Sequence, residues 1–145
     1  MQKLTRSKAI KKLDAVFSEY IRLRDSDENG IVTCPLCWTR IKRKNAQNMH
    51  FITRGCYLYR YDEINCHAGC MRCNVFLNGN YIVYTRRMQK TFGIEKVDEM
   101  IKNKATVFKI STQRLLEMID EYGEKTKKLK ETSIFYRKKD KKSDF

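Results

Sequence analysis

Apolar positions near the N-terminus recur at steps of three and four, which is the spacing of one helix face. Residues 7–24 place one stripe of apolar side chains on such a face: Ile10, Leu13, Val16, Phe17, Tyr20 and Ile21. Ser7 is a suitable N-cap, because its hydroxyl can accept a hydrogen bond from a free backbone N–H. Gly30 favours a turn at the end of "DSDENG". The pattern therefore predicts an amphipathic helix over residues 7–24.

Helical periodicity returns in the second half of the chain. We expect one helix within residues 79–93 and another within residues 93–104, separated at Gly93. A longer helix is predicted over residues 111–131, with Ser111 as its N-cap. The apolar face of this last helix consists of Leu115, Leu116, Ile119 and Tyr122.

The middle of the chain, residues 31–64, has a short and irregular pattern with strand-like pieces. "IVTC" at residues 31–34 and "YLYRY" at residues 57–61 are rich in β-forming side chains. A strand over the second piece would place its three tyrosines on one face: Tyr57, Tyr59 and Tyr61. They can stack on unpaired bases, but packing against the N-terminal helix is the favoured interpretation.

The charge balance changes the picture from a generic small domain to a polyanion-binding one. The 145 residues include 31 Lys or Arg and 17 Asp or Glu, a net charge of +14. Such a surface favours nucleic acid over a merely solvated charged face. No apolar run approaches the about 20 residues of a membrane helix, and residues 1–16 lack the apolar segment of a secretion signal. We therefore expect a cytoplasmic protein that does not bind membranes.

Two closely spaced cysteine pairs predict a metal site, because thiols stay reduced in the cytoplasm. Cys34 and Cys37 form the first pair, Cys70 and Cys73 form the second, and 32 residues lie between them. Two such pairs supply the four thiolates that a structural zinc ion binds tetrahedrally. The other cysteines are Cys56 and Cys66; each can replace a ligand or be a small buried side chain.

The segment between the cysteine pairs contains both histidines of the chain, His50 and His67. Phosphodiester hydrolysis needs an activated water and a cation at the phosphate, and imidazole is a good base near neutral pH. Mg²⁺ accepts amide oxygens such as those of Asn65 and Asn74 while keeping several waters. The residue types alone leave simpler roles open, namely packed or surface histidines and asparagines in turns.

From about Phe17 to Gly93 the chain resembles the lambda-type NinG/Rap recombination endonucleases of phages. The motifs that carry the resemblance are "YIRLRDSDENG", "CPLC", "HFITRG", "RYDEINCHAGCMRCNVFLNGN" and "YIVYTRRM". The resemblance implies an α+β fold, a zinc-braced His-Me finger (ββα-metal, HNH-like) flanked by helices. It also implies cleavage of branched DNA, such as Holliday junctions and D-loops, during phage recombination.

Carried over residue by residue, the resemblance makes His50 the general base at the end of the first strand of the ββα unit. Asn65 resembles the asparagine that pins the loop carrying the base. Asn74 stands at the position of a catalytic-metal ligand, for Mg²⁺ or Mn²⁺. Arg54, four residues after the base, is placed to hold the scissile phosphate. His67, three residues before Cys70, can bind the cation or a phosphate. Alternatively, it donates a hydrogen bond to a residue of the site, or it lies at the surface.

Two positions depart from the family pattern. Met49 stands directly before the base, where many relatives have Asp as a second metal ligand and the lambda type has Gly. Gly69 stands where the family pattern has Gln, whose amide would orient the site or contact DNA. Both departures put the ligand set of the catalytic cation in question.

The resemblance divides the chain into four parts and leads to one expected function. We expect an N-terminal helix over 1–30, a zinc-braced nuclease core over 31–92, C-terminal helices over 93–132 and a basic tail over 133–145. The expected enzyme is a structure-specific endonuclease, with a homodimer and phage recombination proteins as candidate partners. The alternatives are an HNH-type enzyme that nicks duplex DNA and a zinc-dependent DNA-binding module without catalysis. A structural zinc protein that binds another protein fits the charge less well.

Overall fold

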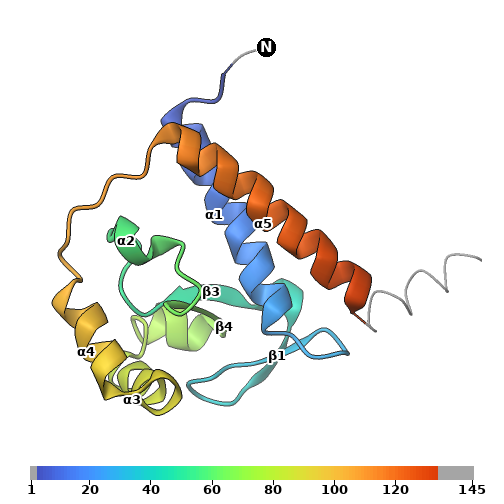
Figure 1. Cartoon of the computed structure of the whole chain (residues 1–145). Coiled ribbons are helices and arrows are strands. Elements are labelled where there is room, and N and C mark those ends of the chain that lie inside the picture. The colour runs from blue at the N-terminus through green and yellow to red at the C-terminus, as the bar shows by residue number, and fades with distance from the viewer. Residues whose placement is uncertain (1–2, 134–145) are drawn as a thin grey trace, which may run out of the picture.

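The computed structural model describes residues 3–133 of the chain. In this range it contains five α-helices and two antiparallel two-stranded sheets, which confirms the predicted α+β class (Figure 1). None of these helices has the length and apolar character needed to cross a membrane. Apart from Ser133, the predicted basic tail lies outside the described residues.

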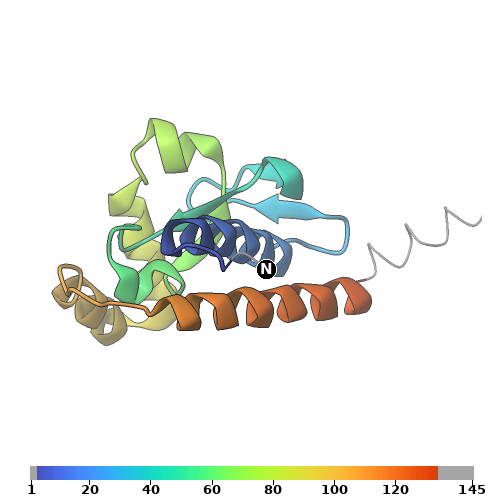
Figure 2. The same cartoon turned by 90° about the horizontal axis from the view of Figure 1, so that it is seen from above.

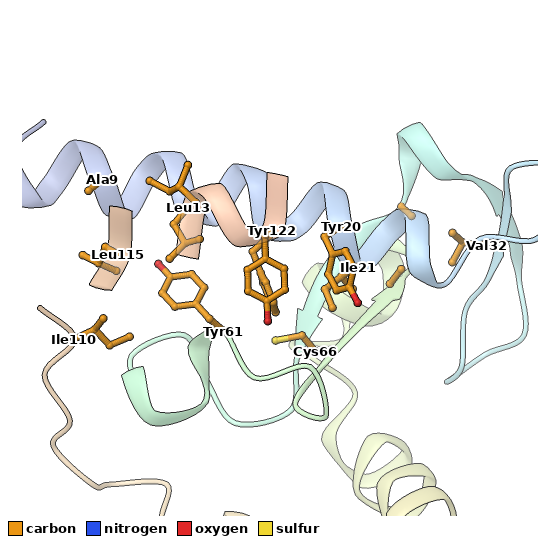
Figure 3. Close-up of a cluster of buried hydrophobic side chains, with 14 residues drawn as sticks. Ala9, Leu13, Tyr20, Ile21, Val32, Tyr61, Cys66, Ile110, Leu115 and Tyr122 are labelled. Carbon is orange, nitrogen blue, oxygen red and sulfur yellow. The ribbon is translucent and has the colours of Figure 1, made fainter. Parts of the chain in front are cut away.

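Two long helices form one layer of the molecule and create its first hydrophobic cluster. α1 (Arg6–Arg24) runs parallel to α5 (Thr112–Thr132) and also packs against the strand layer (Figures 1 and 2). Figure 3 shows Tyr61 and Tyr122 among the side chains of this cluster. The ring of Phe17 meets those of Tyr122 and Tyr61 edge-on, at centroid distances of 4.8 Å and 5.7 Å. Such pairs contribute about 0.5–1.5 kcal/mol each beyond burial. The N-terminal and C-terminal helices therefore share one core.

The N-caps of these helices agree with the sequence in one case and differ in the other. Ser111 caps α5 as predicted, because its hydroxyl accepts the N–H of Arg114 at 3.0 Å. α1 begins before Ser7, because the hydroxyl of Thr5 accepts the N–H of Lys8 at 3.3 Å. The N-cap is therefore a threonine two residues upstream of the predicted serine.

The strand layer consists of two short hairpins, β1 (Ile31–Thr33) with β2 (Arg40–Lys42) and β3 (Gln47–His50) with β4 (Cys66–Gly69). In the second hairpin, His50 pairs with Cys66 and Met49 with His67. Neighbouring positions of a strand face opposite sides, so His50 and Met49 point away from each other.

The end of α1 fixes the position of the second hairpin. The guanidinium of Arg24 donates to the carbonyls of Glu63 and Cys66, both at 2.8 Å. The carboxylate of Asp25 accepts the N–H of Ala68 at 2.8 Å and binds Arg24 at 2.7 Å. The edge of β4 is thus satisfied by side chains of the helix terminus rather than by a third strand.

The prediction of a strand over residues 57–61 was wrong, because these residues form the short helix α2 (Tyr57–Arg60). In a helix the three tyrosines do not share a face. Tyr61 packs against Phe17 in the first cluster, whereas Tyr59 joins a second cluster on the other side. The favoured packing against the N-terminal helix holds for Tyr61, whereas Tyr59 packs in the second cluster.

The second hydrophobic cluster lies beneath the cysteines and is closed by two further helices. α3 (Tyr81–Phe92) and α4 (Ile94–Lys102) meet at Gly93, which has a φ of 89° and separates them as predicted. The cluster includes Met49, Phe51, Tyr84, Met88, Val97 and Met100. Between β4 and α3 lies the π-helical turn η2 (Arg72–Phe76).

Candidate functional site

The two cysteine pairs come together beside the second cluster. The Sγ atoms of Cys34, Cys37, Cys70 and Cys73 all lie within 4.8 Å of one another. Cys37 Sγ and Cys70 Sγ are 3.5 Å apart, and a tetrahedral zinc ion with Zn–S bonds of about 2.3 Å separates its sulfurs by about 3.8 Å. The predicted four-cysteine set is therefore arranged to hold a structural metal such as zinc.

The remaining cysteines stay outside this group. Cys56 and Cys66 are both buried, and neither belongs to the metal-binding set of the described residues. Burial raises the pKa of the Cys66 thiol, which keeps it protonated. Of the two roles left open by the sequence, the structure assigns both residues the role of small buried side chains.

The thiols of the metal-binding set differ in how readily they lose their protons. Burial raises the pKa of Cys73 to about 12 and also raises that of Cys70. At Cys37 burial acts in the same direction, but hydrogen bonds with Thr39 outweigh it and lower the pKa to about 6. Cys37 is thus the most acidic thiol of these three, and coordination must displace the protons of the others.

The two departures from the family pattern, Met49 and Gly69, are coupled by sterics. They lie on neighbouring strands, and Met49 is buried. A Cβ at Gly69 would overlap Met49 Cε, lie 2.5 Å from Met49 Sδ and lie 3.3 Å from Cys34 Sγ. Met49 therefore fills the space that a side chain at position 69 would need, directly against the metal site.

We expect Gly69→Ala to lower the free energy of unfolding by about 1–3 kcal/mol through overpacking. The double variant Gly69→Ala/Met49→Ala should lose less than the sum of the two single losses, because each change makes room for the other. Chemical denaturation of the four proteins measures this coupling. Strict additivity would contradict the steric explanation.

His50 lies in a cleft of about 450 Å³ between α1 and the strand layer. The residues that line this cleft include Lys11, Asp14, Ser18, Gln47, Asn48, Arg54 and Arg60. β3 ends at His50, which is the strand-end position that the resemblance implied. The structure thus brings His50 and Arg54 together in one basic cleft.

The hydrogen bond of His50 determines which ring nitrogen is available for chemistry. His50 Nε2 lies 3.0 Å from the carbonyl oxygen of Arg60. A carbonyl only accepts hydrogen bonds, so Nε2 carries the proton and Nδ1 of the neutral ring has a free lone pair. Burial lowers the pKa of His50, and together with the charges of Arg54 and Arg60 it outweighs the hydrogen bond to the Arg60 carbonyl and the charge of Asp14, which act in the opposite direction. The imidazole is therefore neutral at pH 7 and suited to accept a proton.

Asp14 of α1, which the sequence analysis missed, organises the arginines of the cleft. Its carboxylate binds Arg60 at 2.6 Å and Arg54 at 2.9 Å, and accepts the O–H of Tyr61 at 2.8 Å. Burial alone would raise the pKa of Asp14, but the hydrogen bonds from Arg60 and Tyr61 lower it overall. Helical spacing places Asp14 near the buried stripe, but nothing in the sequence indicates its partners.

Arg54 and Arg60 differ in how many of their donors remain available. Arg60 donates to Asp14 through Nε and Nη2 and to the carbonyl of Arg54 through Nη1. The side chain of Arg54 is 60% exposed and uses only Nη2 in its bond to Asp14. Arg60 is therefore part of the wall of the cleft, whereas Arg54 retains N–H groups for an anion.

Asn65 is fully buried and joins the two ends of the loop between β3 and α2. Its Oδ1 accepts the N–H of Ile52 at 2.6 Å, and its Nδ2 donates to the carbonyls of Ile52 and Tyr59 at 2.9 Å and 3.0 Å. The loop so fixed carries Arg54 and begins directly after His50. This geometry fits a residue that fixes the loop after His50 better than it fits a turn asparagine.

We expect Asn65→Ala to destabilise the protein by about 2–4 kcal/mol, because three buried backbone groups lose their partner. Asn65→Asp should be at least as harmful, since a carboxylate cannot donate to the two carbonyls. Thermal unfolding against the exposed control Asn45→Ala measures the effect. Melting temperatures equal to that of the control would show that Asn65 does not hold the loop.

Asn74 lies in η2 and is not among the residues that line the cleft. Its Nδ2 donates to Oε1 of Gln47 at 2.7 Å, and Gln47 does line the cleft. Because this bond uses Nδ2 of Asn74, the Oδ1 atom of the same amide takes no part in it.

Asn48, on the same strand face as His50, has a buried Oδ1 without a hydrogen-bond donor among the described residues. Gln47 and Asn48 carried no signal in the sequence that set them apart from other polar residues.

His67 faces the side of the hairpin opposite to His50 and lies outside the cleft. Its Nδ1 lies 2.8 Å from the hydroxyl of Tyr84, and its ring contacts those of Tyr84 and Phe92. Burial lowers the pKa of His67 to about 4, so the ring is neutral. Of the roles open to it, the structure favours a packed residue that supports the hairpin.

Acidic residues are absent from two long segments of the chain. Residues 29–61 contain six Lys or Arg, residues 64–94 contain four, and neither segment contains Asp or Glu. The two segments carry all four strands and the four cysteines of the metal site. Glu63, between them, is held by side chains of α1 and α5. The strand layer is therefore positively charged, as binding to phosphates requires.

Comparison with known proteins places the chain in a family. The family model described as "Bacteriophage Lambda NinG protein" matches residues 2–132. Protein ninG of Salmonella phage P22 is 28% identical over 127 residues, which cover 88% of this chain and 60% of the relative. The ninG proteins of Escherichia phages 933W and lambda are 31% and 30% identical over 98 residues, covering 68% of this chain.

The chain spans about half of the phage 933W and lambda proteins, 47% and 46%, and somewhat more of the P22 protein. No solved structure matches the chain. The family match extends from the N-terminal helix through α5 and so includes the cysteine site and the cleft of His50. The chain belongs to the family of the bacteriophage lambda NinG protein.

Proposed function

We propose that the protein is a metal-dependent endonuclease that cuts branched DNA intermediates of phage recombination, such as Holliday junctions and D-loops. The observation that carries the proposal is the state of His50, a neutral histidine with Nε2 held by a carbonyl and Nδ1 free in a basic cleft. A histidine held in this way is prepared to take a proton from water.

The order of elements around the cleft supports a His-Me finger. β3 ends in His50, β4 pairs with it, and the helical turn η2 with Asn74 follows directly. The cysteine pairs flank this unit and hold its ends together. A metal that braces the hairpin would fix His50 relative to η2 without taking part in the reaction.

In the proposed reaction, His50 Nδ1 accepts the proton of the water that attacks the phosphorus. The N–H groups of Arg54 not used by Asp14 bind the scissile phosphate and stabilise its developing charge. A bound Mg²⁺ or Mn²⁺ would add positive charge at the phosphate and the leaving oxygen. The amide oxygen of Asn48, which is buried without a donor among the described residues, fits such an ion, whereas Asn74 reaches the cleft only through its hydrogen bond to Gln47.

The charge distribution supports DNA as the substrate. The two acid-free segments of the strand layer, residues 29–61 and 64–94, carry ten Lys or Arg, so contacts to phosphates should dominate and be sensitive to salt. Such contacts recognise the path of the backbone better than the base sequence, which suits a branched substrate. A four-way junction has twofold symmetry, so a homodimer with one cleft per arm pair is the expected assembly.

One observation favours a second candidate, a zinc-dependent DNA-binding module without catalysis. Asp14, the carboxylate of the cleft, is engaged by Arg60 and Arg54, and Asn74 does not line the cleft. The cation would then depend on neutral amide oxygens. An HNH-type enzyme that nicks duplex DNA would use the same cleft and differs only in its substrate.

The test is cleavage of a labelled synthetic four-way junction, with linear duplex and single strand of matched sequence. Each substrate is incubated with Mg²⁺, with Mn²⁺ and without an added divalent cation, and the zinc content is measured in each condition. Metal-dependent cutting of the junction is expected. Cutting of duplex at defined sequences would instead favour the nicking enzyme. Tight binding without cutting in any metal would favour the non-catalytic module.

A further inference from the structure

Trp38 combines exposure with an unfavourable backbone conformation. It is the single tryptophan of the chain and follows directly after Cys37. Its φ is 66°, a left-handed conformation that glycine adopts freely and bulky side chains rarely do. The residue is 61% exposed, so burial in the core does not compensate for this conformation. A large side chain at a position suited to glycine indicates a role for the indole itself.

Arg87 of α3 contacts the indole of Trp38. Its guanidinium carbon lies 4.7 Å from the centre of the ring, within the range of a cation–π interaction. Among residues 3–133, no carboxylate pairs with Arg87 and no hydrogen bond of its guanidinium is found. An exposed aromatic ring and an arginine with available donors therefore lie together beside the metal site.

The surrounding charge identifies the kind of partner. Trp38 lies in the acid-free segment 29–61 and Arg87 in the acid-free segment 64–94. A nucleotide offers both an aromatic base for stacking and a phosphate for a free guanidinium. A protein partner or a second copy of this chain would need acidic groups to face this surface. Bases paired within a duplex stack on each other, so the ring requires an unpaired base.

We propose that Trp38 and Arg87 form a stacking site for an unpaired base of the DNA substrate, with Arg87 binding the adjoining phosphate. The inference rests on the proposed function and deepens it, because it names the feature of branched DNA that the protein recognises. Trp38 follows Cys37, and η2 contains Cys73, and both cysteines belong to the metal site. The metal site therefore holds Trp38 and η2 in a fixed arrangement. The unpaired base would therefore bind at a fixed position relative to the hairpin.

The fluorescence of Trp38 reports directly on this site, because no other tryptophan contributes. We would titrate the protein with a thymidine oligonucleotide, the four-way junction and a blunt duplex. No divalent cation is added, so that binding is measured without cleavage of the DNA. Stacking is expected to quench the emission with the oligonucleotide but not with the blunt duplex, and quenching by the junction would show that base pairs at its branch point open on binding. Quenching without cleavage in the metal assay would keep the stacking site and reject the nuclease. Cleavage without quenching would support the nuclease and reject the stacking site.

Variants separate stacking from a structural role, with binding measured by anisotropy of labelled oligonucleotide. Trp38→Gly should weaken single-strand binding by about 5- to 100-fold, and Trp38→Phe by less. Because glycine removes the backbone strain, the melting temperature of Trp38→Gly should be unchanged or raised by up to about 5 °C. Arg87→Gln should also weaken binding, whereas the exposed aromatic control Phe108→Ala should not. A destabilised Trp38→Gly with unchanged affinity would overturn the proposal.

Discussion

Replacement of Cys73 by serine is expected to abolish stoichiometric zinc binding and to unfold the strand layer. A structural zinc ion contributes about 10–16 kcal/mol of apparent binding free energy. The net stability of a domain is about 5–15 kcal/mol, so the second hydrophobic cluster should not persist without the metal. Cys73 is buried within that cluster together with Met49 and Tyr84. Zinc content per chain and thermal unfolding followed by circular dichroism measure both effects.

Cys56→Ala is the matched control for the zinc prediction, because Cys56 is a buried thiol outside the metal-binding set. It should retain one zinc ion per chain and lose only the small stability of one buried sulfur. Treatment of the wild type with a chelator should reproduce the unfolding, and added zinc should reverse it. One zinc ion per chain in Cys73→Ser, or an unchanged melting temperature after chelation, would contradict a structural role of the metal.

The helices could be predicted because their signals are local. The apolar stripe of residues 7–24 and the cap at Ser111 depend only on helical periodicity and on neighbouring N–H groups. The strand over residues 57–61 was predicted wrongly because alternating tyrosines in a short segment fit either structure. Tyr61 and Tyr59 belong to different clusters, and only the tertiary packing decides between the two.

The candidate site divides in the same way between local and long-range information. The spacing of the cysteine pairs is enough to predict the metal site, because each pair forms one tight turn. The cleft instead depends on contacts that bridge distant parts of the chain, such as Asp14 of α1 with Arg60 of α2. The steric exchange between Met49 and Gly69 is likewise visible only once β3 and β4 are paired. Sequence spacing contains no information on any of these pairs.

His50→Ala is expected to reduce the rate of junction cleavage by about 10²–10⁴-fold, the usual contribution of a general base. Binding of the junction and the zinc content should stay unchanged, because within residues 3–133 the side chain of His50 makes a single hydrogen bond, to the carbonyl of Arg60. Single-turnover cleavage at saturating protein separates the chemical step from binding. Ser18→Ala, which changes another residue lining the same cleft, should cleave at the wild-type rate.

The dependence of the rate on pH tests the same role independently. Burial lowers the pKa of His50 in the folded protein below its ordinary value of about 6.5. A base must be neutral to act, so the cleavage rate should be near its plateau at about pH 8 and should fall to half of that plateau only at a pH below about 6.5. His50→Ala should lose this acidic limb along with most of its rate, since the titrating group is gone. Retention of the limb, or a rate within threefold of the wild type, would show that another group activates the water. With intact junction binding, that result would reject His50 as the base and leave the stacking site at Trp38 untouched.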